Sequence, residues 1–382
     1  MKKIAIIHDW LTGMRGGEKV LECLCELFPQ SDIFTLLHIP GSVSPLIENR
    51  TIYTSFLQKL PLIKTHYRTY LPLFPLAIES FSVDAYDMVI SSSHCVAKGV
   101  ITPPSTLHVC YSHTPMRYVW EHYHTYFGKN KKGFMTRTAM NIFAHYLRMW
   151  DVSSSNRVDY FTANSYNVAN RIKKYYRRTA KVIHPPVDCS LFTPPDTYEE
   201  GGYYLIVSAF APYKRIDIAI EAFRELGLPL VIIGGGQEEQ LIKNMAKNNI
   251  KCLGWQPGEV LKDFYRNCKA LIFPGVEDFG IVPLEVQACG KPVIAYAKGG
   301  VLETVRGIYP DSESRPEMKQ KQPETPTGVF FTEQTTESLL EAVRFFEHNK
   351  NIFDPLSIRK HAEGFDSLIF KEKFKRYIET II

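Results

Sequence analysis

Two glutamates lie eight residues apart in the stretch FPGVEDFGIVPLEVQACGKPVIAYAKGG, residues 273–300. Because the segment before it reads as a buried strand, Glu277 is predicted to lie in a strand-end loop and Glu285 on the helix that follows. A carboxylate accepts hydrogen bonds from two neighbouring hydroxyl groups. We therefore expect Glu277 to bind a sugar and Glu285 to bind a ribose. The alternative interpretation is one charge at a helix N-terminus and one charge on the surface.

Cationic and amide groups at neighbouring strand ends suit a diphosphate between those two sugars. Lys214 and Arg215 follow the strand-like run YYLIVSAF and directly precede a helix. Phe279, Gly280 and Ile281 open the helix that carries the second glutamate, where the first amides lack helical partners. Cations beside such amides form phosphate sites. A solvated basic pair is the alternative for Lys214 and Arg215.

Glycines at other strand ends allow the backbone to approach a ligand closely. Gly234 follows the strand-like run LVII and, with the loop after KCLGW, could line a nucleotide pocket. Gly16 and Gly17 precede the first predicted helix, whose positive end would point at whatever binds there. Their spacing matches neither a GxGxxG motif nor a P-loop, so a plain turn is the alternative.

Strands alternate with helices along both halves of the chain, which predicts parallel sheets covered on both faces. In the first half the strand-like runs are KKIAIIHDW, DIFTLLH, DMVISSS, LHVCYSH, YFTANS and KVIHPPV. The proline-rich residues 184–202 read as a linker, after which the alternation restarts and continues to PVIAY. The sequence therefore predicts an α/β fold of two doubly wound domains, with ligands outside the carboxyl ends of the strands.

Targeting signals and cysteine spacing exclude several classes of protein. The N-terminus lacks the apolar core of a signal peptide, and no apolar run reaches the roughly 18 residues of a membrane span. The eight cysteines form neither a CxxC pair nor a zinc-binding spacing, and they read as buried thiols. A cytoplasmic location is therefore expected.

Basic residues dominate the first half, because residues 1–185 carry 22 Lys and Arg against 12 Asp and Glu. No nucleic-acid-binding signature is present, so an anionic membrane surface is the more natural partner. Within this half, residues 56–81 mix aromatic, leucine and basic side chains, as interfacial segments do. A solvated positive face and a helix pair packed on its own domain are the alternatives.

The combined motifs resemble family 4 of the retaining GT-B glycosyltransferases. The resemblance rests on Glu277-x7-Glu285, the following GKPV and the pair Gly299-Gly300. Further motifs occur in the family's order along nearly the whole chain, namely GGEKV, YSHTPMRYVW, NSYNVANRI, HPPVD, VSAFAPYKRIDIAIEAF, IIGGG and LGWQPGEVLKDFYRNCKALIFP. Within the family, the chain resembles bacterial mannosyltransferases of O-antigen and exopolysaccharide assembly.

This resemblance implies a GT-B fold in which two Rossmann-like domains face a central cleft. Residues 1–185 would form the acceptor-binding domain, residues 186–360 the nucleotide-sugar-binding domain, and a helix at about residues 361–382 would pack back on the first. The implied reaction moves a hexose, with mannose from GDP-mannose favoured, onto a lipid-linked or growing surface-polysaccharide acceptor. It would retain the anomeric configuration and need no metal and no cofactor beyond the nucleotide-sugar donor.

The resemblance also assigns single positions to parts of the donor. Gly16–Gly17 and Lys214 would lie at its diphosphate. His113 would reach the donor sugar or the reacting bond, and Glu277 would hold the hydroxyl groups of the transferred sugar. Trp255 would lie near the base.

One position departs from the family pattern, because the common arginine five residues before the lysine is Ala209 here. Arg215, Arg15 and Arg117 are the candidates for the missing cation. A catalytically inactive partner that binds nucleotide sugar or lipid is therefore one alternative. Another GT-B enzyme, such as an epimerase, is a second alternative.

Overall fold

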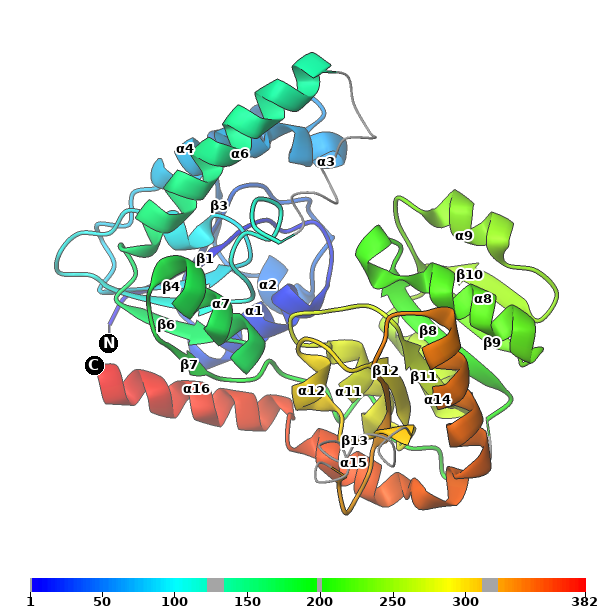
Figure 1. Ribbon diagram of the computed structural model, residues 1–382. Helices are drawn as coiled ribbons and strands as arrows, with labels where there is room; N and C mark the ends of the chain where they lie inside the picture. The colour runs from blue at the N-terminus through cyan, green and yellow to red at the C-terminus, as the bar shows by residue number, and fades with distance from the viewer. Residues whose placement is uncertain (1, 122–133, 198–200, 311–321) are drawn as a thin grey trace. The chain divides into compact units, whose positions relative to one another are not determined.

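The computed structural model describes residues 2–121, 134–197, 201–310 and 322–382, and it divides into two compact units (Figure 1). Unit 1 comprises Met1–Pro186 and Phe370–Ile382, and unit 2 comprises Val187–Ile369. The division after Pro186 falls one residue beyond the boundary expected from the sequence.

Unit 1 is built on a seven-stranded parallel sheet in the order β3-β2-β1-β4-β5-β6-β7. Its strands are β1 (Ile4–His8), β2 (Asp32–Thr35), β3 (Ile52–Thr54), β4 (Met88–Ser93), β5 (Leu107–Ser112), β6 (Tyr160–Ala163) and β7 (Ala180–Val182). The predicted runs account for every strand except β3. That edge strand is exposed or half-buried along its length, so its sequence lacks the apolar run by which the other strands were predicted.

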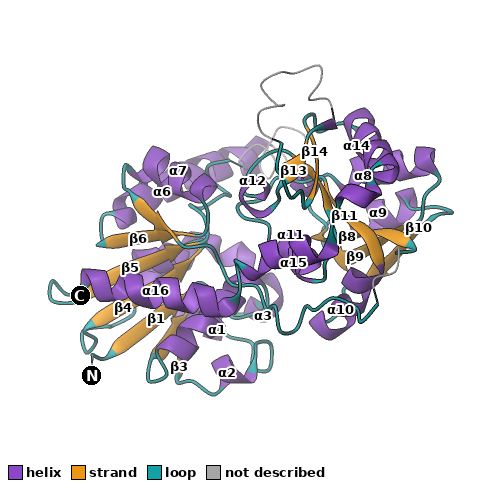
Figure 2. Cartoon of the chain, turned by 90° about the horizontal axis from the view of Figure 1, so that it is seen from below, coloured by secondary structure: helices purple, strands orange, loops and turns teal. Residues whose placement is uncertain are grey.

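Helices cover both faces of this sheet (Figure 2). They are α1 (Gly16–Leu27), α2 (Pro45–Glu48), η1 (Phe56–Lys59), α3 (Ile63–His66), η2 (Tyr67–Leu73), α4 (Phe74–Glu79), η3 (Ala97–Gly99), α6 (Phe134–Ser155) and α7 (Tyr166–Tyr176). Successive residues of β1 point to opposite faces. Ala5 and Ile7 pack with α4 and α6, whereas Ile6 packs with α1.

Unit 2 repeats this plan with the parallel order β10-β9-β8-β11-β12-β14-β13. Its strands are β8 (Tyr203–Ala209), β9 (Leu230–Gly235), β10 (Ile250–Gly254), β11 (Cys268–Phe273), β12 (Val293–Tyr296), β13 (Gly307–Ile308) and β14 (Gly328–Phe331). The strands β13 and β14 follow PVIAY, which was the last strand predicted. Leu205 and Ile206 of β8 belong to separate core clusters on the two faces.

The helical segments of unit 2 are η4 (Pro212–Lys214), α8 (Ile216–Leu226), α9 (Glu239–Met245), α10 (Gly258–Asn267), α11 (Ile281–Ala288), α12 (Val301–Thr304), α14 (Thr336–His348), η6 (Lys350–Ile352) and α15 (Pro355–Glu363). The last helix, α16 (Ser367–Ile381), begins several residues later than expected because α15 occupies the preceding residues. From Phe370 onward it packs into unit 1, where Phe370 and Phe374 lie against Tyr111.

The two sheets confirm the predicted α/β class and the two doubly wound domains. Residues 56–81 form η1, α3, η2 and α4, and they bury Leu57, Ile63 and Phe74 in the core of unit 1. The same segment leaves Leu62 and Leu76 exposed. No helix in the described ranges has the length and apolar character that a membrane span requires.

Candidate functional site

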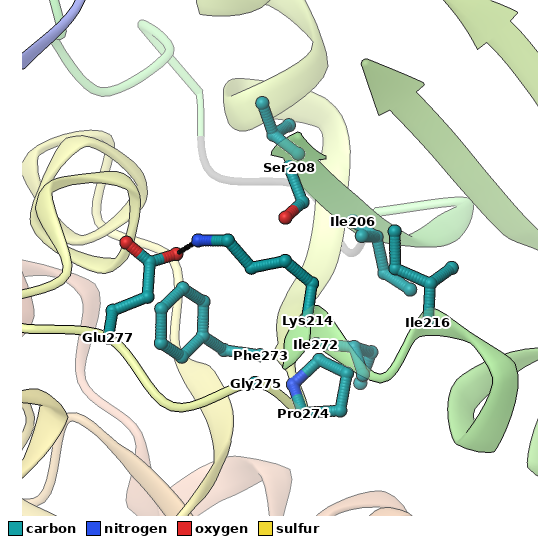
Figure 3. A pocket seen from close by; sticks show the side chains of 10 residues that line it. Ile206, Ser208, Lys214, Ile216, Ile272, Phe273, Pro274, Gly275 and Glu277 are labelled. Carbon is teal, nitrogen blue, oxygen red and sulfur yellow. Dashed lines mark hydrogen bonds and ion pairs between the residues drawn. The ribbon is translucent and has the colours of Figure 1, made fainter. Parts of the chain in front are cut away.

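The strand order of unit 2 brings two of the predicted site residues together. The order reverses between β8 and β11, and in doubly wound sheets this switch point is where ligands bind. Lys214 lies in the loop after β8, and Glu277 lies in the loop after β11. Both line one pocket with Ser208 and Gly275, and the lysine side chain extends across it to the carboxylate (Figure 3).

Lys214 is positioned by a tight approach between two loops. It ends the single turn of η4, where its backbone N–H donates to the carbonyl of Ala211. A Cβ atom on Gly275 would lie 2.9 Å from the Lys214 Cα, so only glycine allows the loop after β11 to pass this close. The largely buried ammonium group then forms an ion pair with Glu277.

Glu277 is held through its backbone by the two glycines of the signature. It pairs with Gly299 in an isolated parallel bridge, and its carbonyl accepts a hydrogen bond of 2.9 Å from the N–H of Gly300. A Cβ atom on Gly299 would lie 2.6 Å from the same carbonyl oxygen. These glycines therefore fix the loop that carries the carboxylate, which explains why they follow it in the sequence.

The second glutamate lies on α11 and does not line the pocket of Lys214 and Glu277. Glu285 accepts a hydrogen bond of 2.8 Å at Oε2 from the hydroxyl of the buried Tyr265. Gly280, with φ of 92°, is the N-cap of α11, so the amides of the first turn begin at Ile281 without intrahelical partners. The loop and helix positions predicted for these residues are those observed.

Arg215 does not line the pocket beside Lys214. Its guanidinium group forks onto both carboxylate oxygens of Asp217, with Nε at 3.1 Å from each. Ala209, the departure from the family pattern, is exposed at the end of β8. Lys214 is therefore the basic residue among those that line the pocket, and the source of the cation that Ala209 lacks stays a prediction.

Gly234 and Trp255 occupy the ends of the two strands beyond β8. Gly234 pairs with Ser208, and a Cβ atom on it would lie 1.8 Å from the Ser208 carbonyl oxygen. This glycine is therefore required for strand packing, whatever binds nearby. Trp255 follows β10 and is 75% exposed, which leaves its ring available for stacking.

Unit 1 gathers its predicted residues at its own switch point, between β1 and β4. His113 follows β5, and Gly16 and Gly17 open α1. A Cβ atom on Gly17 would lie 3.8 Å from His113 Nε2 and 3.6 Å from His8 Cε1. The start of α1 therefore lies directly beside two imidazole rings, at a distance where a side-chain Cβ would make ordinary van der Waals contact.

Several polar residues around His113 were not predicted as site residues. Ser92 Oγ lies 2.9 Å from His113 Nε2 and 3.1 Å from His8 Nδ1, and His8 and Ser92 are register partners in β1 and β4. Glu18 Oε1 lies 3.7 Å from His8 Nε2. The signal in the sequence was a histidine at the end of the first strand and a glutamate in the first turn of the next helix.

A second buried carboxylate lies beside this group. The carboxylate of Asp9 accepts backbone hydrogen bonds of 2.6–2.9 Å from four successive residues, His94 to Ala97. Its Oδ2 also lies 3.1 Å from His94 Nδ1. Burial alone would raise the pKa of Asp9, but His94 and the backbone donors lower it overall, so the carboxylate stays ionised.

Burial keeps the predicted catalytic imidazole neutral. It lowers the pKa of His113 to about 3, and the neighbouring rings of His94 and His8 add to the effect. Burial also lowers the pKa of His94. At neutral pH the His113 ring therefore carries one proton on one of its two nitrogens, and the surrounding hydrogen bonds decide which.

Comparison with known proteins places this geometry in a known class. Residues 191–361 match the family model described as Glycosyl transferases group 1. An uncharacterized glycosyltransferase of Methanocaldococcus jannaschii is 33% identical over 165 residues, which cover 40% of this chain and 46% of that protein. The chain spans less than half the length of the curated relatives it matches.

Solved structures extend the likeness to both units. Sucrose-phosphate synthase from Thermosynechococcus elongatus has a TM-score of 0.72 at 16% identity, covering 100% of this chain and 99% of that chain. HepE of Anabaena, in complex with UDP and glucose, has a TM-score of 0.67 at 15% identity, with 99% and 100% covered. The two units thus have the GT-B fold, and the match to the glycosyl transferases group 1 model lies within unit 2.

Proposed function

We propose that this chain is a retaining glycosyltransferase that transfers a hexose from a nucleoside diphosphate sugar, without a metal. The observation that carries the proposal is the pair of Lys214 and Glu277 at the switch point of unit 2. A cation there stabilises the negative charge that develops on a departing diphosphate. A carboxylate beside it accepts hydrogen bonds from sugar hydroxyls.

The donor we propose first is GDP-mannose, on the resemblance to bacterial mannosyltransferases. UDP-glucose is the second donor to test, since the structural neighbour HepE was solved with UDP and glucose. In this proposal Glu285 binds the ribose, and the amides of residues 279–281 bind sugar and phosphate. A nucleotide sugar that binds only the folded chain raises its melting temperature, so a panel of GDP- and UDP-sugars identifies the donor.

Transfer itself is tested by two substitutions in the pocket. Lys214→Ala and Glu277→Ala should each lower turnover at least tenfold, because each removes a group that acts on the leaving diphosphate or the transferred sugar. The melting temperature of each variant controls for folding. Turnover near that of the wild type in both variants would refute this site, and it would favour a binding partner without catalytic activity.

We further propose that the acceptor is lipid-linked and that unit 1 docks on an anionic membrane surface. Apolar side chains are exposed on two elements of one core cluster, residues 56–81 and α6, and they are Leu62, Leu76, Ile142, Tyr146 and Met149. The last three repeat at helical spacing along one side of α6. Exposed Lys59 and Lys64 lie in the first of these elements, as an anionic surface requires.

Vesicle flotation tests this docking. The wild type should float with vesicles that contain phosphatidylglycerol and remain behind with phosphatidylcholine alone. The double substitution Leu62→Ser and Leu76→Ser should reduce flotation, since it removes exposed apolar area. Leu241→Ser, at a residue 52% exposed on unit 2, is the matched control and should leave flotation unchanged. Equal flotation with both vesicle types would argue against an electrostatic contribution of the basic side chains to membrane docking.

A further inference from the structure

A row of neighbouring polar side chains leads from Glu18 to His113 in unit 1. His8 Nδ1 and His113 Nε2 both hydrogen-bond to Ser92 Oγ. Glu18 Oε1 lies 3.7 Å from His8 Nε2, which is beyond hydrogen-bond distance, so Nε2 has no hydrogen-bond partner among the described residues and Glu18 acts on it through its charge. Glu18, His8 and Ser92 are buried, and His113 is half-buried at the end of the row. We call these four residues the relay.

The serine at the centre of the relay makes the two imidazole rings dependent on each other. A hydroxyl group has one hydrogen to donate, and it can accept others at the same oxygen. Ser92 can therefore donate to only one of the two ring nitrogens, and when it donates to His8 Nδ1 it must accept from His113 Nε2. A lone pair on His8 Nδ1 therefore places the proton of His113 on Nε2.

Glu18 favours one proton position on His8. Burial alone would raise the pKa of Glu18, but contact with His8 lowers it overall, so Glu18 is a carboxylate at neutral pH. Its Oε2 accepts the backbone N–H of Arg15 at 3.0 Å, which leaves Oε1 facing His8 Nε2. A lone pair on Nε2 would face a buried negative charge, so the charge of Glu18 favours a proton on His8 Nε2.

We infer that Glu18, acting through His8 and Ser92, holds His113 in the tautomer that carries its proton on Nε2. His8 Nδ1 then accepts from the Ser92 hydroxyl, and Ser92 Oγ accepts from His113 Nε2–H. The remaining nitrogen, His113 Nδ1, presents a lone pair. Within the described ranges the hydrogen bond of the His113 ring is the one at Nε2, which leaves the acceptor capacity of Nδ1 for a ligand.

The neighbouring pair of Asp9 and His94 does not compete for this role. The Asp9 carboxylate accepts hydrogen bonds from the backbone N–H groups of residues 94–97 and contacts His94 Nδ1. Asp9 therefore fixes the loop after β4, and its hydrogen bonds within the described ranges do not include one to His113. The His94 and His113 ring centroids are 6.3 Å apart, and no hydrogen bond between the two rings is among those of the described residues. The relay is therefore the path that sets the His113 proton.

The tautomer restricts the ligand chemistry that His113 can recognise. A lone pair on Nδ1 accepts a hydrogen bond from a hydroxyl group, and it repels a phosphate oxygen, which has no hydrogen to donate. Resting on the function proposed above, this assigns His113 to a sugar hydroxyl and not to the diphosphate. Glu18, His8 and Ser92 are positioning residues for that contact.

Nitrogen NMR of the full chain labelled with ¹⁵N-histidine tests the tautomer without any substrate. At a pH of about 8.5, well above the usual histidine pKa of about 6.5, neutral rings distinguish a protonated nitrogen from an unprotonated one by chemical shift. The His113 signals are those lost in His113→Gln. We expect an unprotonated Nδ1 and a protonated Nε2. A protonated Nδ1 in the wild type would overturn the inference.

Glu18→Gln should reverse the tautomer. The amide oxygen of the substituted side chain would keep the hydrogen bond from the Arg15 N–H, which leaves the amide NH₂ facing His8 Nε2 and forces a lone pair there. His8 would then donate from Nδ1, Ser92 would donate to His113 Nε2, and the His113 proton would move to Nδ1. Glu22→Gln, at a half-buried glutamate on the same helix, is the matched control and should change nothing.

Ser92→Ala provides a second variant in case Glu18→Gln impairs folding. It removes the central hydroxyl, so the His113 shifts should no longer follow the state of Glu18 and should show both tautomers. An unchanged wild-type pattern in either Glu18→Gln or Ser92→Ala would overturn the relay. A structural role alone would alter stability without moving these shifts.

Ligand binding tests the assignment to a hydroxyl separately. His113→Ala should weaken binding of the nucleotide sugar roughly fivefold, the effect of losing one hydrogen bond, and leave binding of the nucleoside diphosphate unchanged. Equal weakening of both ligands would place His113 at the phosphate and refute this assignment. If neither ligand binds the wild type, the proposed function fails, whereas the NMR result still decides the relay.

Discussion

Replacing Glu277 with glutamine should strengthen the binding of a nucleoside diphosphate while impairing transfer. Glu277 forms an ion pair with Lys214, which is the basic residue among those that line the pocket. A diphosphate must compete with this carboxylate for the ammonium group, and it is also repelled by the carboxylate's charge. Glu277→Gln removes both effects and keeps nearly the same shape.

The size of the effect follows from the exposure of the pair. The side chains of Lys214 and Glu277 are 10% and 26% exposed, so solvent screens them less than a fully exposed pair. Exposed pairs contribute about 0.2–1 kcal/mol, and we take about 1 kcal/mol for this one. Since about 1.4 kcal/mol is a tenfold change in affinity, Glu277→Gln should lower the Kd of GDP or UDP roughly fivefold.

Titration calorimetry with GDP and UDP at low ionic strength measures this change, because salt screens the competing charges. Turnover of the same variant with the complete donor should fall, since the hydroxyls of the transferred sugar lose a carboxylate acceptor. Glu225→Gln is the control, because it breaks an exposed ion pair between α8 and α14 of unit 2, formed by Glu225 and Arg344. It should alter neither the Kd of the nucleoside diphosphate nor the turnover. Unchanged or weaker diphosphate binding in Glu277→Gln would refute the competition argument.

Three further predictions concern the free energy of unfolding and the binding of the nucleotide base. Lys98→Met leaves the buried carboxylate of Asp151 without its cation, so the free energy of unfolding in urea should fall by about 3–5 kcal/mol. Burial lowers the pKa of His108 to about 4, so below a pH of about 6.5 the unfolded chain takes up a proton that the folded chain excludes. The wild type should therefore lose about 2 kcal/mol of stability between pH 7 and pH 5 through this residue, and urea unfolding of His108→Gln should lack that loss. Trp255→Ala should weaken nucleotide binding in calorimetry without changing the melting temperature, because the ring is exposed; unchanged affinity would remove Trp255 from the base.

The sequence alone was sufficient to predict the elements that carry the site in unit 2. A strand that is buried on both faces reads as an apolar run, so the ends of β8 and β11 were recognisable. The loops after them supplied Lys214 and Glu277. Gly275, Gly299 and Gly300 could be recognised as turn residues, although their contacts with those loops could not.

Local geometry already limited what the sequence could reveal. Arg215 was a candidate for the second cation because it follows Lys214. In the structure its guanidinium group points to Asp217, two residues further on. The charge of a side chain is visible in the sequence, but the direction in which it points depends on backbone angles, and Arg215 has a φ of 50°.

The relay in unit 1 was decided only by the tertiary structure. Its hydrogen bonds join His8 to Ser92 across 84 residues, and Ser92 to His113 across 21. The sequence determined that His8, Ser92 and His113 would lie near strand ends and Glu18 at the start of a helix, because apolar runs and their polar ends set secondary structure. Which strands become neighbours, and in which register, depends on packing between distant segments, and that alone brought His8 and Ser92 to the same level of the sheet.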